Sequence, residues 1–98
     1  MTKQNSMKSE EFYNNLKAQL DEHTVFPTKY LYKFIVPTKG IGVGEIETKF
    51  DNLGAVIETK VSSKGKYTAV SILVKMPSAD SIISKYREME CVKGIMAL

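Results

Sequence analysis

The chain has 98 residues, 43% of them hydrophobic and 26% charged, which is the composition of one ordinary globular domain. Its formal net charge of +3 is a weak basic excess and does not by itself indicate a nucleic-acid-binding protein. The single cysteine excludes an intrachain disulfide and favours a cytoplasmic setting. No apolar run approaches the roughly 18 residues of a membrane span, so we expect no membrane partner.

Residues 1–24 are predicted to form a polar tail followed by an amphipathic helix. Residues 1–8 are polar and are expected to be disordered. Ser9 is a suitable N-cap, since two glutamates follow it in the first turn. Apolar residues then recur at helical spacing, at Phe12, Leu16 and Leu20. This stripe predicts that the helix packs on a surface, such as the open face of a sheet in its own chain or in a partner.

Residues 25–98 alternate between strand-like and helix-like patterns. Strands are predicted at 29–36, 55–61, 67–75 and 92–98, with one helix over 43–53, closed by Gly54, and another that begins after the N-cap Ser78. A polar break containing Gly65 joins the second and third strands as a hairpin. The C-terminal helix should bury an apolar face made by Ile82, Ile83, Tyr86 and Met89.

This order predicts an α+β fold, a ferredoxin-like βαββαβ sandwich with a four-stranded antiparallel sheet, two helices on one face and an extra N-terminal helix. The first and third strands should be central. The helix-covered face is expected to use Tyr32, Phe34, Val36, Ile57, Val70, Ile72 and Val74. The opposite face is expected to show Leu31, Lys33, Ile35, Val56, Glu58, Lys60, Tyr67, Ala69, Leu73, Lys75, Lys93 and Ile95. A face this apolar usually meets a partner.

Several short segments resemble one known family. They are Phe26-Pro27, Tyr32-Lys33, and Ser62-Ser63-Lys64-Gly65 followed by Tyr67 and Ser71. From about residue 26 to residue 98 the chain resembles the YbeD-like family of small bacterial proteins. The resemblance implies a ferredoxin-like domain over residues 25–98, similar to the ACT regulatory domains. The family's biochemical function is not established, so the resemblance carries over no catalytic residue.

A glycine-rich segment precedes the first of the two helices that should cover the sheet. Gly40, Gly42 and Gly44 follow a strand and open a helix, where backbone N–H groups can hold an anion. Ligands of ACT domains, which the fold resembles, often lie near this junction. The spacing is neither that of a dinucleotide-binding motif nor that of a P-loop. The plainer interpretation is a connector, since lone glycine clusters usually mark turns.

The hairpin concentrates positive charge. Its candidate interaction residues are Lys60, Ser62, Ser63, Lys64, Gly65 and Tyr67. Lysines with a neighbouring tyrosine suit a phosphate or a nucleic-acid backbone. The plainer interpretation is a solvated hairpin whose lysines discourage edge pairing. The third strand carries Ala69 and Ser71 where an RNA-binding sheet needs aromatic residues, so stacking on bases is poorly provided for.

The sequence offers no catalytic set, and we expect no enzyme activity, no metal and no cofactor. His23 is the only histidine and Cys91 the only cysteine, so metal and Cys–His chemistry both lack parts. We expect His23 to be solvated and Cys91 to pack as a small core residue.

Three hypotheses follow from these patterns. The first is a non-enzymatic, ACT-like regulatory module that binds a small-molecule ligand or a partner protein, and that forms a homodimer through its sheet. The second is a nucleic-acid-binding ferredoxin-like domain, which the modest charge disfavours. The third is an enzyme of unrecognised type.

Overall fold

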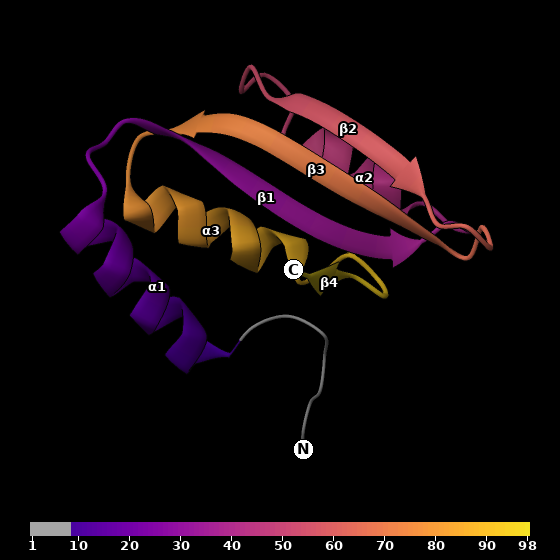
Figure 1. Cartoon of the computed structure of the whole chain (residues 1–98), viewed down its shortest axis with the longest axis horizontal. Coiled ribbons are helices and arrows are strands. Elements are labelled where there is room, and N and C mark those ends of the chain that lie inside the picture. Colours follow the sequence, from indigo (N-terminus) through magenta and orange to yellow (C-terminus); the bar gives the residue numbers. More distant parts are fainter. Residues whose placement is uncertain (1–8) are drawn as a thin grey trace.

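The computed structural model describes residues 9–98, so the disorder predicted for residues 1–8 lies outside the described residues. The elements are α1 (Glu10–His23), β1 (Thr28–Pro37), α2 (Gly42–Lys49), β2 (Val56–Val61), β3 (Tyr67–Met76), α3 (Ala79–Met89) and β4 (Met96–Ala97). The strands form one sheet in the order β2-β3-β1-β4 (Figure 1). All neighbours are antiparallel, with β1 and β3 central, which confirms the predicted ferredoxin-like fold.

The central pair β1–β3 is the longest contact in the sheet. It runs without interruption from Thr28 opposite Met76 to Pro37 opposite Tyr67. α2 and α3 both lie against the same face of the sheet, since Phe50 at the end of α2 and Tyr86 of α3 both contact the ring of Tyr32. Side chains along a strand alternate between the two faces, so this pairing decides which residues meet the helices.

The core lies between the sheet and these two helices. The residues predicted for the helix-covered face are buried, except that Ile57 is half-buried. α3 begins at Ser78, whose side chain accepts a hydrogen bond from the backbone N–H of Ser81 in a capping box. Its predicted apolar face is buried as well, in Ile82, Ile83, Tyr86 and Met89. The apolar residues that recur every 2 positions along the strands and every 3.6 positions along the helix therefore pack into one core.

The predicted hairpin is confirmed between β2 and β3. Ser62 donates its backbone N–H to the carbonyl of Tyr67 at 2.7 Å, and its side chain accepts from the Tyr67 N–H at 3.2 Å. Gly65 closes the turn by donating to the Ser62 carbonyl at 2.9 Å, and it has φ +76°. Glycine is the residue that takes this conformation at least cost.

α1 packs on α3, outside the sheet (Figure 1), which confirms that this helix packs on a surface; that surface is a helix and not the open face of a sheet, which the stripe could also have covered. Tyr13 anchors it, since the ring is only 1% exposed and its hydroxyl donates to the Glu90 carboxylate at 2.9 Å. The Arg87 guanidinium lies over this ring at 4.6 Å from its centre and pairs with the Glu10 carboxylate, with Nη2 to Oε1 at 2.9 Å. Tyr13 is not part of the apolar stripe predicted from Phe12, Leu16 and Leu20.

The tyrosine hydroxyls in this core all have hydrogen-bond partners. The Tyr30 and Tyr86 hydroxyls are 2.8 Å apart, and Tyr32 donates to the Ile82 carbonyl at 2.9 Å. Burial raises the pKa of Tyr32 and of Tyr86 well above the ordinary value of 10.0. Burial, followed by the hydrogen bond to Glu90, does the same to the pKa of Tyr13. A tyrosine hydroxyl is protonated at physiological pH even at its ordinary pKa, and burial extends this to more alkaline pH, so these hydroxyls serve as structural donors.

α2 is shorter than predicted, since it ends at Lys49 and not at Leu53. The N–H of Phe50 donates to the Glu47 carbonyl, a tightened last turn that lets its ring reach the core against Tyr32, with the two ring centres 5.2 Å apart. Leu53 lies beyond this turn and is 40% exposed. Tertiary packing of one aromatic residue thus ends the helix early.

β4 is also shorter than predicted and contains only two residues. Residues 92–95 instead form turns, in which Val92 donates to the Met89 carbonyl and Ile95 to the Val92 carbonyl. Val92 and Ile95 are both buried, so Ile95 does not lie on the uncovered face as predicted. Lys93 lies in these turns and not in a strand. Gly94, at φ +77°, permits this turn.

We expect Tyr13→Ala to lower the free energy of unfolding by about 3–5 kcal/mol, because it removes a nearly fully buried aromatic ring. Tyr13→Phe keeps the ring and loses only the hydrogen bond to Glu90, so about 1 kcal/mol is expected. Urea unfolding followed by circular dichroism measures both. Equal effects of the two variants would contradict a packing role for the ring.

We expect the attachment of α1 to weaken in acid. The hydrogen bond from Arg87 holds the pKa of Glu10 below its usual 4.5. A carboxyl whose pKa is lowered by folding stabilises the folded state above its unfolded pKa, and this contribution is lost as the pH falls through the folded pKa. Stability is measured from about pH 6 down to about pH 2, a range that spans the titration of carboxylates. Over this range the free energy of unfolding should fall less steeply in Glu10→Gln than in the parent. Identical slopes would contradict the pairing.

Candidate functional site

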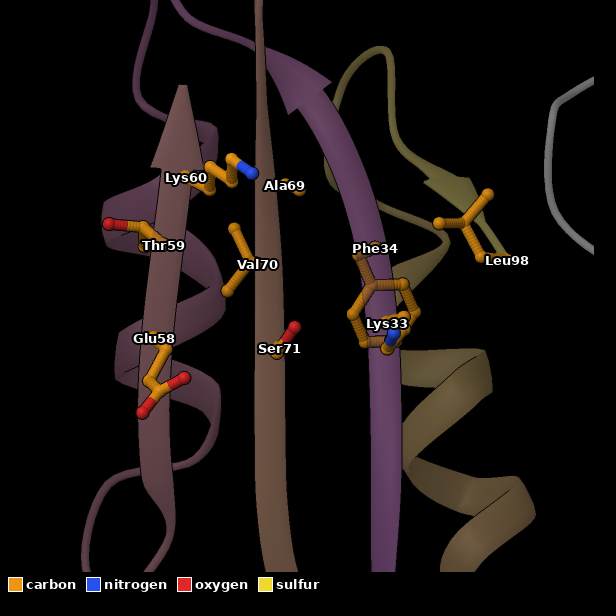
Figure 2. A pocket seen from close by; sticks show the side chains of 9 residues that line it. All are labelled: Lys33, Phe34, Glu58, Thr59, Lys60, Ala69, Val70, Ser71 and Leu98. Carbon is orange, nitrogen blue, oxygen red and sulfur yellow. The ribbon is translucent and has the colours of Figure 1, made fainter. Parts of the chain in front are cut away.

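The most prominent candidate site is the face of the sheet that no helix of the described residues covers, which we call the open face. Alternation along the strands places on it Lys29, Leu31, Lys33, Ile35, Val56, Glu58, Lys60, Tyr67, Ala69, Ser71, Leu73, Lys75, Met96 and Leu98. Figure 2 looks onto part of it, with Glu58, Ser71 and Lys33 on three neighbouring strands and α2 behind them.

The strand register arranges these side chains in rows across the sheet. One row is apolar and runs from Val56 through Leu73 to Leu31, with exposures of 59%, 38% and 48%. The next row is polar and runs from Glu58 through Ser71 to Lys33. Beside Lys33 lies Leu98, whose N–H donates to the Lys33 carbonyl at 2.9 Å.

Two shallow hollows follow these rows. The larger, of about 450 Å³, lies around the polar row and extends to Lys60 and Leu98, as Figure 2 shows. The smaller, of about 170 Å³, lies over the apolar row. Both include Glu58 and Ser71, so the hollows are continuous along the face. A surface of this shape fits an extended or helical segment of a macromolecule better than a small molecule held on all sides.

The open face has a positive charge balance. Lys29, Lys33, Lys60 and Lys75 oppose Glu58 alone, a sum of +4 and −1 that leaves +3. Among residues 9–98, none of these five side chains takes part in an ion pair within 4.0 Å. Their charges are therefore available to a partner, where opposite charge speeds encounter and selects the partner.

The sequence identified most of the open face but misplaced the last strand. The predicted Lys93 and Ile95 lie off the face, and Met96 and Leu98 lie on it instead. The cause is that residues 92–95 form turns, so the strand begins only at Met96, and its alternation is one residue out of phase with the predicted one. Lys29 and Ser71 were missed too, although strict alternation along β1 and β3 would have found them.

The hairpin residues separate into two groups. Lys60 lies on the open face, whereas Ser62, Ser63, Lys64 and Gly65 form the turn at the end of the sheet. Tyr67, the first residue of β3, is 49% exposed beside this turn. The hydrogen bonds of Ser62 and Gly65 are used to build the turn itself.

The glycine segment lies at the same end of the sheet as the hairpin, because Thr38 donates to the Lys66 carbonyl at 2.9 Å. A hollow of about 590 Å³ brings Gly40 and Gly42 together with Lys39 and Lys93, a neighbourhood that sequence spacing did not predict. Its lining also includes Glu45, in the first turn of α2, which opposes binding of an anion there.

The glycines themselves have structural roles. Gly42 is buried, and a Cβ built on it would lie 3.1 Å from the Cβ of Val36, so close helix–strand packing accounts for it. Gly40 has φ +109°, a backbone conformation that other residues rarely adopt. Gly44 has open space around it and ordinary helical geometry.

His23 and Cys91 are both exposed in the structure. For Cys91 this corrects the predicted core position. Cys91 follows the end of α3, where the buried positions go to Met89 and Val92, and its thiol donates to the Glu88 carbonyl at 3.2 Å. His23 ends α1, with Nε2 3.0 Å from the Glu22 carboxylate. Within residues 9–98, no group of three or more His, Cys, Asp or Glu side chains could hold a metal ion.

The fold and the open face together define a small ferredoxin-like α+β domain with one uncovered sheet face. Residues 21–98 match the family model described as "Protein of unknown function (DUF493)". The chain belongs to this family, in agreement with its resemblance to the YbeD-like proteins.

Curated relatives come from Shewanella species and are called "UPF0250 protein". One from Shewanella baltica (strain OS155) is 32% identical over 91 residues, and one from Shewanella woodyi is 28% identical over 90 residues. Each comparison covers 82% of this chain and 94% of the relative. No solved structure gives a significant match. Of the helices in residues 9–98, none has the length and apolar character needed to cross a bilayer.

We expect Gly44→Ala to stabilise the fold by about 0.5–1 kcal/mol, because alanine is the better helix former and the new methyl group meets no atom. Gly40→Ala should instead destabilise by about 1–3 kcal/mol, because of its positive φ. Thermal unfolding of the two variants measures both effects. Destabilisation by Gly44→Ala would contradict the expectation that Gly44 is an ordinary residue of the first helical turn.

Proposed function

We propose that this chain is a small, non-enzymatic, cytoplasmic binding module of ACT-like fold that regulates a protein partner by docking it on the open face. The observation that carries the proposal is the apolar row of Val56, Leu73 and Leu31, which crosses three neighbouring strands, is exposed, and is flanked by lysines. An exposed apolar patch with a polar rim is the usual character of a protein interaction site.

The charge of the open face favours an acidic partner. With four lysines against one glutamate, two copies of this face would repel each other if they stacked directly. A partner that presents apolar residues bordered by aspartate or glutamate satisfies both the apolar row and the lysines. Desolvation of the apolar row supplies affinity, and the lysines supply orientation.

The titratable groups of the core support a non-enzymatic function. The tyrosines are the buried ionisable side chains, and burial raises the pKa of Tyr32 and Tyr86, away from the range useful for proton transfer at neutral pH. Their hydroxyls are already bonded to the Ile82 carbonyl and to Tyr30. Nucleophilic catalysis needs a nucleophile beside a base. His23 contacts the Glu22 carboxylate and Cys91 contacts the Glu88 carbonyl, so neither contact forms such a pair.

Nucleic acid is the second macromolecule that a basic sheet face suits, and the centre of the open face argues against it. Ile35, Ala69 and Ser71 occupy neighbouring positions of β1 and β3, where a sheet that stacks bases carries aromatic rings. The exposed ring nearest to them is that of Tyr67, at the hairpin end of β3.

We expect Leu73→Asp to weaken partner binding at least about tenfold, because it places a charge in the middle of the apolar row. Val25→Asp is the matched control, since Val25 is 88% exposed and lies outside the sheet. A photo-crosslinking residue at position 73 in cells that express the chain should yield one protein adduct. That protein, once purified, is titrated with the parent and with both variants.

Two further measurements separate the alternatives. The first is titration with a single-stranded polynucleotide at several salt concentrations. Any binding should be the same in the parent and in Leu73→Asp. A thermal-shift panel of amino acids and other metabolites tests for a small-molecule ligand. Binding of polynucleotide that depends on Leu73, or the same partner affinity in Leu73→Asp and Val25→Asp, would overturn the proposal.

A further inference from the structure

The exposed edge of the sheet at β2 offers unpaired backbone groups, which the open face does not, and it shares Glu58 and Lys60 with that face. β2 pairs with β3 on one side and has no strand on the other among residues 9–98. Five of its six residues are exposed, and Ile57 is half-buried. An uncovered edge of this kind is a template for a further strand, and proteins usually block it with charged side chains, prolines or bulges. β2 has no proline, and its two charged residues, Glu58 and Lys60, have opposite signs and can neutralise each other across a symmetric strand pair.

Backbone hydrogen bonding decides which residues of β2 can pair outward. The Ser62 N–H donates to the Tyr67 carbonyl, so the backbone of Ser62 points toward β3. Backbone direction alternates along an antiparallel strand, so Lys60 and Glu58 also point toward β3. Ile57, Thr59 and Val61 therefore present their N–H and C=O groups to the free side.

We propose that β2 pairs antiparallel with β2 of a second copy, with the two-fold axis at Thr59. In this register the outward-pointing residues meet as Thr59 with the partner copy's Thr59 and as Ile57 with its Val61. Each of these pairs exchanges two N–H···O bonds. The two four-stranded sheets become one continuous sheet, and the two open faces lie side by side on it.

Side chains support this register over its neighbours. With the axis at Thr59, Glu58 lies directly opposite Lys60 of the second copy, twice by symmetry. These are non-hydrogen-bonded positions, where Cα atoms are only about 4.5 Å apart and side chains interact most closely. On the other face of the sheet, half-buried Ile57 meets Val61, which is 52% exposed.

The adjacent two-fold registers are unfavourable for reasons of charge. An axis at Glu58 sets two glutamates opposite each other, and an axis at Lys60 does the same with two lysines. Like charges directly opposite each other destabilise a strand pair. With the axis at Ile57 or Val61, Glu58 no longer lies opposite Lys60 of the second copy, and fewer residues of the two strands pair. The second copy is thus selected by charge as well as by shape.

This inference goes beyond the proposed function, because it uses the outward backbone groups of β2, although Glu58 and Lys60 also belong to the open face. Charge reversal tests it. We expect sedimentation across a dilution series that reaches the millimolar range to show a monomer–dimer equilibrium for the full chain. Glu58→Lys and Lys60→Glu should each weaken dimerisation by about tenfold, since each creates two like-charge pairs. The double variant Glu58→Lys/Lys60→Glu should restore the parent affinity.

A proline at the axis separates edge pairing from association through the open face. The Thr59 N–H points away from β3, so Thr59→Pro keeps the bonds to β3 and removes the two central bonds that the Thr59 residues of the two copies exchange. It should abolish the dimer, whereas Thr59→Val, which keeps the N–H, should not. Circular dichroism of each variant reports whether it is folded.

Amide hydrogen exchange gives a readout that does not depend on any variant. In the parent, the N–H groups of Ile57, Thr59 and Val61 should become protected as the concentration rises, while those of Glu58 and Lys60 are protected throughout. A parent that stays monomeric over the whole series, or a dimer that survives Thr59→Pro and is indifferent to the charge reversals, would overturn the inference.

Discussion

The pairing of β1 with β3 is the constraint on which the rest of the structure depends. Ten residues of each strand lie opposite each other, and a shift of one residue would exchange the two faces of the sheet. The actual register turns Tyr32, Phe34 and Val36 toward α2 and α3, together with Val70, Ile72 and Val74. The same register turns Leu31 and Leu73 to the other side, where nothing in residues 9–98 covers them. One set of backbone hydrogen bonds thus creates both the core and the candidate site.

The extra helix α1 changes which surface of this domain is open. It packs on α3 through Tyr13, whose hydroxyl reaches the Glu90 carboxylate, and through the pair of Arg87 with Glu10. The helical side of the sandwich therefore becomes thicker, while the sheet side keeps its exposed apolar row. The contact between α1 and α3 buries apolar residues of both helices, among them Tyr13 and Tyr86, whereas the apolar row of the sheet stays exposed.

We propose that charge assigns the open face and the β2 edge to different kinds of partner. The open face carries a net charge of +3, which opposes a second copy of itself and suits an acidic protein. The β2 edge carries Glu58 and Lys60 two positions apart, which suits a second copy under a two-fold axis. The two surfaces meet along β2, so a dimer joined at this edge would present a doubled basic face without covering either half.

The sequence by itself determined the fold class, the hairpin and most of both faces of the sheet, because alternation along a strand, capping at Ser78 and the turn glycine are local properties. It did not determine the end of α2 at Lys49, the two-residue β4, or the exposure of Cys91. Each depends on which distant side chains fill the core. α2 ends where Phe50 packs against Tyr32, and β4 is short and Cys91 exposed because Val92 and Ile95 take the buried positions. Only the tertiary structure decided that α1 binds α3 and leaves the open face uncovered, since an amphipathic stripe specifies an apolar neighbour without specifying which one.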